Sequence, residues 1–160
     1  MKVTKPNREQ ITRDIRSALE TMEFNFQYNE DAHAFTFNQK IDAAISSMSV
    51  IIVVRNEDFF IMTTAPLKGD AKNERQIAEL SRLIMRMNYQ LVHGAYNLDV
   101  SDGEINFQVS CLTYGMTTIP TSLIVAQLML CAHSWETAAK KFLGVLFAGL
   151  TGDAAFELEE

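Results

Sequence analysis

The strongest constraint on the fold lies in residues 88–110, NYQLVHGAYNLDVSDGEINFQVS, where an Asp-Gly pair separates two alternating segments. Apolar side chains occupy every second position on either side of this pair, at Tyr96, Leu98, Val100, Ile105, Phe107 and Val109. A period of two is typical of strands with one buried face. Asp102 and Gly103 suit a two-residue turn with positive φ. The segment predicts an antiparallel β-hairpin, preceded at Gly94 by a bulge or a close backbone approach.

The hydrophobic period changes several times along the rest of the chain. Residues 8–22, 72–88 and 121–149 repeat apolar side chains every three or four positions, as amphipathic helices do. Short strand-like segments between the first two helices predict an antiparallel meander, and SVIIVVR at 49–55 is interpreted as a central strand covered on both faces. We therefore expect an α+β fold in which a twisted antiparallel sheet of five or six strands packs with three helices. The expected order is helix, β-meander, helix, β-hairpin, helix.

Length and charge distribution predict one domain with an acidic end. The chain has 160 residues, of which 48% are hydrophobic, as in ordinary globular domains. Residues 151–160 hold four of the 20 acidic residues and no basic one, so we expect a domain at 1–150 and a mobile tail at 151–160. The other 16 acidic residues nearly balance the 14 basic ones. This composition lacks the basic face that nucleic-acid binding requires.

The cysteine content and the apolar segments predict a cytoplasmic protein. Cys111 and Cys131 are lone thiols, which suit a reducing compartment. The N-terminus carries charges where a signal peptide needs a continuous apolar segment. The apolar runs at 122–132 and 142–150 are shorter than the roughly 20 residues of a membrane helix. We therefore expect no contact with a membrane.

Residues that could carry catalysis or bind a metal are scattered along the chain. His33, His93 and His133 stand alone, without the HxH or HExxH spacing of zinc sites, and glycine-rich phosphate-binding motifs are absent. The sequence therefore predicts no catalytic residue, no metal and no cofactor. An enzyme whose site assembles from distant residues, such as His93, Asp99 and Cys111, remains an alternative.

Two stretches could contact partners. Residues 122–132 are apolar nearly all round, and four of them lie outside the stripe expected to face the sheet: Leu123, Val125, Met129 and Leu130. Because such patches are rarely left in water, we expect a homodimer or a protein partner there, with burial inside one subunit as the alternative. A weak restart signal at Ser134 leaves open whether 121–149 is one helix or two. The second stretch is basic, with Lys72, Arg75, Arg82 and Arg86 on one helix face, which could dock an acidic partner or be solvated.

Several residues within 75–109 form a recognisable pattern: Arg75, Ile77, Asn88, Leu91, Gly94, Leu98, Asp102, Gly103, Glu104, Ile105 and Phe107. Together with the order of elements, this pattern resembles the YbjN family, a bacterial group with a fold similar to the type III secretion chaperones. Among these residues, Asn88, Gly94, Asp102 and Gly103 form the fold signature. The resemblance implies an α+β domain that forms a homodimer and presents hydrophobic surface to a protein partner. The family is also described as sensory-transduction regulators without a defined reaction.

These features predict a non-enzymatic protein-binding module of chaperone-like architecture, with regulation as one role. The alternative is a small-molecule sensor or regulator with a pocket between sheet and helix. An enzyme is the third interpretation, and the expected partners are a second copy of the chain and another protein.

Overall fold

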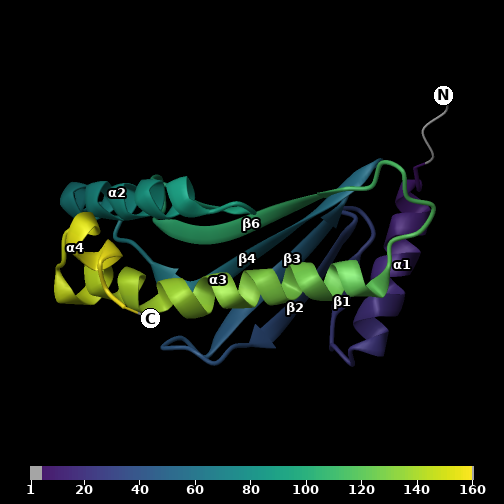
Figure 1. Ribbon diagram of the computed structural model, residues 1–160, viewed down its shortest axis with the longest axis horizontal. Helices are drawn as coiled ribbons and strands as arrows, with labels where there is room; N and C mark the ends of the chain where they lie inside the picture. The colour runs from purple at the N-terminus through teal and green to yellow at the C-terminus, as the bar shows by residue number, and fades with distance from the viewer. Residues whose placement is uncertain (1–4, 160) are drawn as a thin grey trace.

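The computed structural model describes residues 5–159, which form a six-stranded antiparallel sheet and four helices (Figure 1). The strands are β1 (Gln27–Asn29), β2 (Ala34–Lys40), β3 (Ser47–Val54), β4 (Asp58–Lys68), β5 (Ala95–Leu98) and β6 (Glu104–Leu112). The helices are α1 (Arg8–Thr21), α2 (Glu74–Gln90), α3 (Thr121–Ala148) and α4 (Gly152–Phe156). The sheet order is β1-β2-β3-β4-β6-β5. The α+β class, the antiparallel sheet and the predicted order of elements are confirmed, and the short helix α4 is additional.

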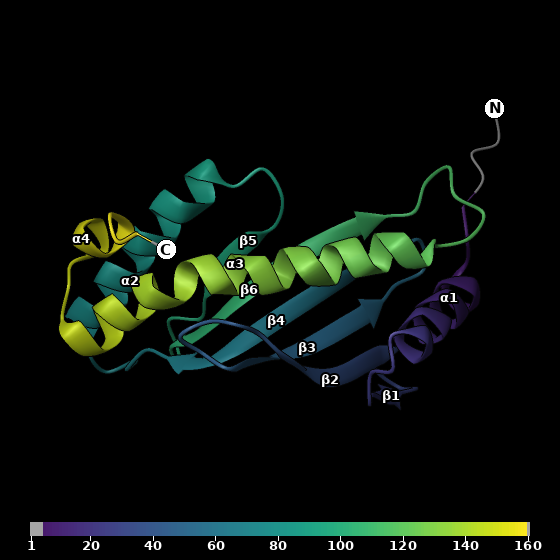
Figure 2. The same cartoon turned by 60° about the horizontal axis from the view of Figure 1, so that its bottom comes forward.

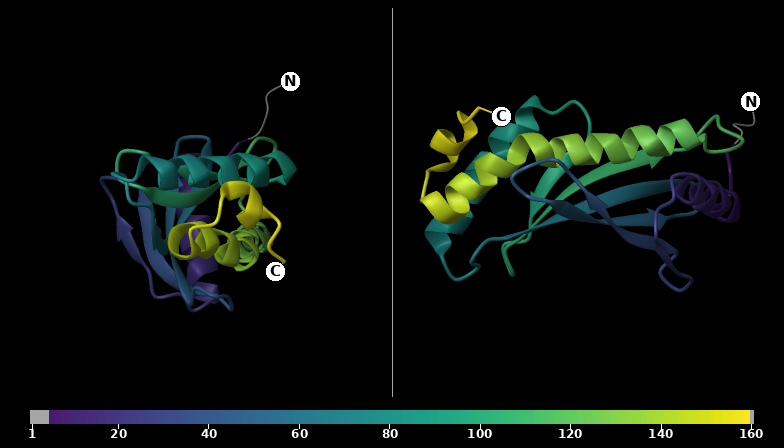
Figure 3. Two further views of the ribbon diagram at one scale, coloured as in Figure 1. Left: turned by 90° about the vertical axis from the view of Figure 1, so that its left-hand side faces the viewer. Right: turned by 90° about the horizontal axis from the view of Figure 1, so that it is seen from below.

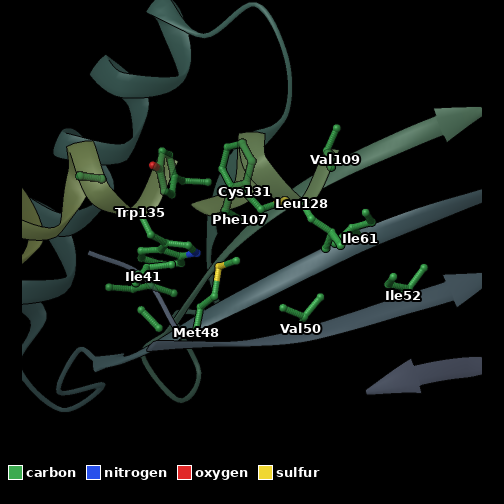
Figure 4. Close-up of a cluster of buried hydrophobic side chains, with 14 of the residues drawn as sticks. Ile41, Met48, Val50, Ile52, Ile61, Phe107, Val109, Leu128, Cys131 and Trp135 are labelled. Atoms are coloured by element: carbon green, nitrogen blue, oxygen red, sulfur yellow. The ribbon is translucent and has the colours of Figure 1, made fainter. Parts of the chain in front are cut away.

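Helices α1 and α3 pack against the same face of the sheet. Helix α3 runs along the sheet, with α1 near one end and α2 and α4 near the other (Figure 2). Viewed end-on, the sheet curves around α3 (Figure 3, left). In Figure 4, Ile61 and Val109 of the sheet lie on the same side as Leu128 and Trp135 of α3. The hydrophobic core therefore lies between α3 and this covered face of the sheet.

Helix α3 is continuous over 28 residues, so residues 121–149 contain one helix rather than two. Ser134 donates its hydroxyl to the carbonyl of Leu130 (2.8 Å) within the helix, and no new helix begins there. The next residue, Trp135, is fully buried, and its Nε1 donates to the hydroxyl of Thr63 on β4 (2.9 Å). Because these two buried polar groups satisfy each other, they fix α3 over the middle of the sheet.

The predicted hairpin is present, but its turn is longer than expected. Leu98 and Ile105 form the last strand pair, and beyond them the N–H of Asp99 donates to the carbonyl of Glu104 (2.9 Å). The loop between Asp99 and Glu104 therefore holds four residues, 100–103, instead of two. A two-residue turn of the expected type needs positive φ at both positions, and of the Asp-Gly pair only Gly103 has it, with φ at 82°. The Asp102 carboxylate instead accepts the N–H of Glu104 (2.9 Å), which stabilises the wider turn.

The acidic C-terminal segment is folded onto the basic face of α2, which differs from the mobile tail expected from composition. Within this segment α4 buries Ala155 completely. Arg82 pairs with Asp153 (3.1 Å), while Arg86 pairs with Asp153 (3.2 Å) and Glu157 (2.9 Å). Two of the four basic residues predicted to form a stripe on residues 72–88, Arg82 and Arg86, thus pair with acidic side chains of their own chain.

Candidate protein-binding surface

One face of the sheet is left uncovered by the helices. Along β3, Val50 and Ile52 are buried on the side of α3. Ile51 and Val53, which point to the other side, are half-exposed. The prediction that residues 49–55 form a strand covered on both faces is therefore wrong. Continuous β-branched runs are typical of strands buried on both sides. In β3 such a run places apolar side chains on both faces of an antiparallel sheet, but helices cover only one of these faces.

We call this uncovered surface the open face. It comprises the middle of one side of β2, β3, β4 and β6: Thr36, Asn38, Ser49, Ile51, Val53, Phe60, Met62, Thr64, Asn106, Gln108, Ser110 and Leu112. Lys40, Asp58 and Glu104 lie on the same side, at the strand ends. At its centre lies the apolar block, formed by two cross-strand pairs: Ile51 with Met62, and Val53 with Phe60. Hydroxyl and amide side chains flank the block on most sides, and at its end the guanidinium of Arg55, which pairs with Asp58, lies 5.5 Å from the centroid of the Phe60 ring. Leu112 projects at the end of β6 and is 67% exposed.

The middle of this side of the sheet carries no charge. None of the twelve residues of the open face is ionisable, although 21% of the chain is charged. Charged side chains begin at the strand ends, where Asp58 accepts from Arg55 (2.9 Å) and Lys68 pairs with Asp102 (2.8 Å). Depletion of charge around aromatic and methionine side chains distinguishes the core of a protein interface from other surface. The open face therefore has the composition of a protein-binding surface.

Beside the apolar block, the open face is hollowed. A cavity of about 400 Å³ lies over β1, β2 and β3, lined by Asn25, Gln27, Thr36, Phe37, Asn38, Ser49, Val50 and Ile51. Its lining is uncharged, with amide and hydroxyl groups next to aliphatic ones. We call it the edge hollow, and it leaves room for a side chain that protrudes from a partner.

The sheet edge at β5 is closed by a side chain. Asn88, near the end of α2, accepts a hydrogen bond from the backbone N–H of Tyr96 and donates one to its carbonyl, both at 2.8 Å. The amide of Asn88 thus takes the place of a neighbouring strand at this point. Its position in the fold signature is explained by this structural role.

The other signature residues also serve the hairpin. Gly94 has a φ of 74°, and a Cβ there would lie 2.3 Å from the ring of Phe107. At Gly103 a Cβ would lie 2.0 Å from the carbonyl oxygen of Gly69, so these two backbones meet too closely for any side chain. Asp102 stabilises the turn between the strands. The signature therefore describes how the hairpin is held, and none of its residues lies on the open face.

Four residues of α3 were expected to meet a partner: Leu123, Val125, Met129 and Leu130. The structure divides them, because Leu123 and Leu130 pack against the core of their own chain. Met129 is 65% exposed and Val125 is half-exposed. Helix α1 packs against α3 in addition to the sheet, which accounts for part of the apolar excess in 122–132. Met129 and Val125 therefore remain accessible to a partner on the surface of α3.

The residues considered for catalysis are not brought together. Cys111 is buried on the covered face, where burial raises the pKa of its thiol to about 11. Asp99 lies at the opposite end of β6, roughly 20 Å away at about 3.4 Å per strand residue. His93 is exposed between α2 and β5. Among residues 5–159, no three His, Cys, Asp or Glu side chains cluster as a metal site would require.

A second hollow, of about 370 Å³, lies where α2, β5, α3 and α4 meet. It is lined by Met87, Gln90, Leu91, Tyr96, Thr137, Ala138, Lys141 and Phe156. The Tyr96 hydroxyl donates to the carbonyl of Ser134, and burial raises the pKa of this phenol. This hollow corresponds to the pocket between sheet and helix considered for a sensor. Within the described chain, no helix is both long and apolar enough to cross a lipid bilayer.

Comparison with known proteins identifies the fold. No protein-family model matches the chain, and no curated protein is detectably similar to it in sequence. The crystal structure of YbjN from E. coli, a protein described as a candidate transcription regulator, is similar with a TM-score of 0.50. The likeness covers 86% of this chain and 89% of that one at 11% sequence identity. The chain therefore has a YbjN-like fold, as the residues between 75 and 109 predicted.

Proposed function

We propose that this chain is a non-enzymatic protein-binding module of chaperone-like architecture with a regulatory role, and that the open face is its binding surface. The observation that carries the proposal is the apolar block, which lies among neutral side chains in the middle of the open face and meets charge only at its end, where Arg55 pairs with Asp58. Covering such a block removes apolar area from water, which is worth about 25 cal/mol per Å², and leaves no unpaired charge buried. The YbjN-like fold is consistent with a regulatory or binding module.

The mode of binding follows from the edge of the sheet. Because Asn88 occupies the backbone groups of Tyr96, a partner cannot add a full strand beside β5. We therefore expect the partner to pack on the open face through side chains. A partner that fits it offers apolar side chains surrounded by neutral polar groups.

The test is affinity capture from a native cell lysate, followed by mass spectrometry, with the wild type and two variants. Ile51→Lys places a charge in the apolar block, and Tyr89→Lys makes a similar change at a side chain on α2 that is 92% exposed. We expect proteins retained by the wild type and by Tyr89→Lys to be lost with Ile51→Lys. If all three capture the same proteins, with circular dichroism showing each one folded, the open face is not the binding surface.

A small-molecule sensor is the second candidate, because the hollow at Tyr96 falls within the usual size of ligand sites, about 300–1,000 Å³. Thermal unfolding in a metabolite screen addresses it. A ligand for this hollow should raise the melting temperature of the wild type and of Ile51→Lys alike. It should not stabilise Gln90→Trp, in which a larger side chain narrows the hollow.

A further inference from the structure

We propose that the surface beneath the C-terminal segment is a second protein-binding site, which takes a short acidic helix of a partner in place of the chain's own. The segment, residues 151–159, lies against α2 and the end of α3 (Figure 1). We call the surface that holds it the tail groove, formed by Glu79, Arg82, Leu83, Arg86 and Lys141. None of these residues belongs to the open face, so the tail groove is a site beyond the proposed function.

The tail groove binds the carboxylates of the segment through two arginines. Arg82 pairs with Asp153, while Arg86 pairs with both Asp153 and Glu157. The guanidinium of Arg86 also lies 3.9 Å from the centroid of the Phe156 ring, within the range of a cation–π contact. The groove therefore fits an aromatic residue that is followed by one acid and preceded, three positions earlier, by another.

Backbone groups at both ends of α4 are bound as well. The N–H of Gly152 donates to the Glu79 carboxylate (2.8 Å). At the other end, the Lys141 ammonium donates to the carbonyls of Phe156 (2.6 Å) and Leu158. A carboxylate at the N-terminus and an ammonium at the C-terminus match the free N–H and C=O groups of a helix. These contacts select a segment that is helical.

One position of the segment has to be glycine. A Cβ at Gly152 would lie 2.4 Å from the carbonyl oxygen of Glu79 and 2.8 Å from the backbone nitrogen of Leu83, both in α2. Because these backbone atoms belong to a regular helix, a larger residue lifts the segment off α2. Ala155 is fully buried and has to be small too. The partner segment that fits therefore has the order Gly-Asp-x-Ala-Phe-acid, as residues 152–157 have.

The chain's own segment is held in a way that permits exchange. Of its described residues, only Gly152 and Ala155 are buried, and its ion pairs lie at the surface, where such pairs contribute little to stability. Hollows of about 370 Å³ and 280 Å³ remain beside Phe156 and Leu150. Segments with little buried apolar surface open locally while the rest of the protein stays folded. A partner can therefore replace this segment without unfolding the sheet.

Anisotropy of a labelled peptide with the sequence of residues 151–159, TGDAAFELE, tests the exchange on the full chain. Gly152→Val in the chain lifts its own segment away and leaves the groove intact. Ala154→Val, at an exposed position of the same segment, is the matched control. If the segment occupies the groove roughly nine-tenths of the time, the peptide should bind Gly152→Val about tenfold tighter than the wild type or Ala154→Val. Asp153→Lys, which repels both arginines, releases the segment a second way and should give a similar gain.

Two further changes separate docking in the groove from attraction between charges. A peptide with valine in place of its glycine keeps the charge of the original and should bind Gly152→Val at least about tenfold more weakly. Adding Arg86→Glu to the Gly152→Val chain should abolish binding of the original peptide. Arg13→Glu, the same change at an exposed residue of α1, should leave binding unchanged. Circular dichroism checks that each variant is folded.

Three results overturn the inference. The first is equal binding, or no binding, of the peptide to the wild type and to both variants that release the segment. The second is undiminished binding of the valine-containing peptide, and the third is a loss with Arg13→Glu as large as with Arg86→Glu. None of these results affects capture by the open face, which is tested with Ile51→Lys, so the proposed function stands or fails separately.

Discussion

The two faces of the sheet are built from similar residues but meet different surroundings. Phe59 and Phe60 are adjacent on β4, yet Phe59 is fully buried beneath the helices and Phe60 is half-exposed on the open face. Ile52 and Ile51 on β3 show the same contrast. Strand propensity and alternation depend on residue type, which both faces share. Covering depends on where helices pack, and here α1 and α3 pack on one face.

Polar groups also differ between the faces. On the covered face, Thr63 accepts from Trp135 and donates to the carbonyl of Phe107 (3.3 Å), so its hydroxyl is satisfied inside the protein. On the open face, Thr64 is half-exposed and can bond to water. On the open face, neutral polar residues lie beside the apolar block, where water can bond to them. On the covered face, the hydroxyl of Thr63 is tolerated because it has hydrogen-bond partners within the protein.

The largest expected effect separates the two phenylalanines. Phe59→Ala leaves a cavity in the core and should lower the free energy of unfolding by about 3–5 kcal/mol. Phe60→Ala should cost less, about 1–2 kcal/mol, because the ring lies on the open face and is only partly buried. Urea unfolding of the two variants at low protein concentration measures the difference. Equal losses would show that the open face is covered within a single chain.

The second effect concerns the edge of the sheet. Asn88→Ala removes both hydrogen bonds to the backbone of Tyr96 and should destabilise the protein by about 2 kcal/mol. It also frees the β5 edge, so concentration-dependent aggregation is expected. Asn97→Ala is the matched control, since its exposed amide bonds only to another side chain, Asn106. Similar losses in the two variants would contradict the role given to Asn88.

Local patterns predicted most of the fold, and long-range partners account for what they missed. Alternation on either side of Asp102 and Gly103 located the hairpin, because strand registers depend on neighbours in sequence. The turn length was not predicted, because the wider turn depends on a hydrogen bond from the N–H of Glu104 to the Asp102 carboxylate. The residue pattern alone does not show that this hydrogen bond forms. The folded state of the C-terminal segment was not predicted, because it depends on ion pairs between its carboxylates and Arg82 and Arg86 of α2, which are far away in the sequence.

The candidate site was less predictable than the fold. The run SVIIVVR shows that both sides of β3 are apolar, but sequence alone does not tell which side a helix covers. The excess of apolar residues on α3 was apparent from the sequence. However, two of these residues, Leu123 and Leu130, pack against the core of the same chain rather than facing solvent. Apolar residues such as Ile51 and Phe60 could have indicated an exposed binding surface. They were instead interpreted as buried, because the strand at 49–55 was expected to be covered on both faces.

The third effect compares neighbouring threonines. Thr63→Val keeps the shape of the side chain but leaves the indole N–H of Trp135 without its acceptor, which should cost about 1–2 kcal/mol. Thr64→Val, one residue further along β4 on the open face, should change stability by less than about 0.5 kcal/mol. Guanidinium unfolding followed by Trp135 fluorescence measures both. A neutral Thr63→Val would mean that water reaches the indole of Trp135.

The smallest effect tests how dry the covered face is. Cys131 of α3 is fully buried there, and burial raises the pKa of its thiol to about 12 from an ordinary value of 9.0. Below pH 9 the thiol is neutral in both states; above it the unfolded chain loses the proton first, so stability falls as pH rises. Between pH 8 and 10 this loss should be about 1 kcal/mol. Urea unfolding under reducing conditions should show a correspondingly smaller loss for Cys131→Ala. An identical loss in wild type and variant would show that the thiol ionises as readily in the folded protein, and that the covered face is not sealed from water.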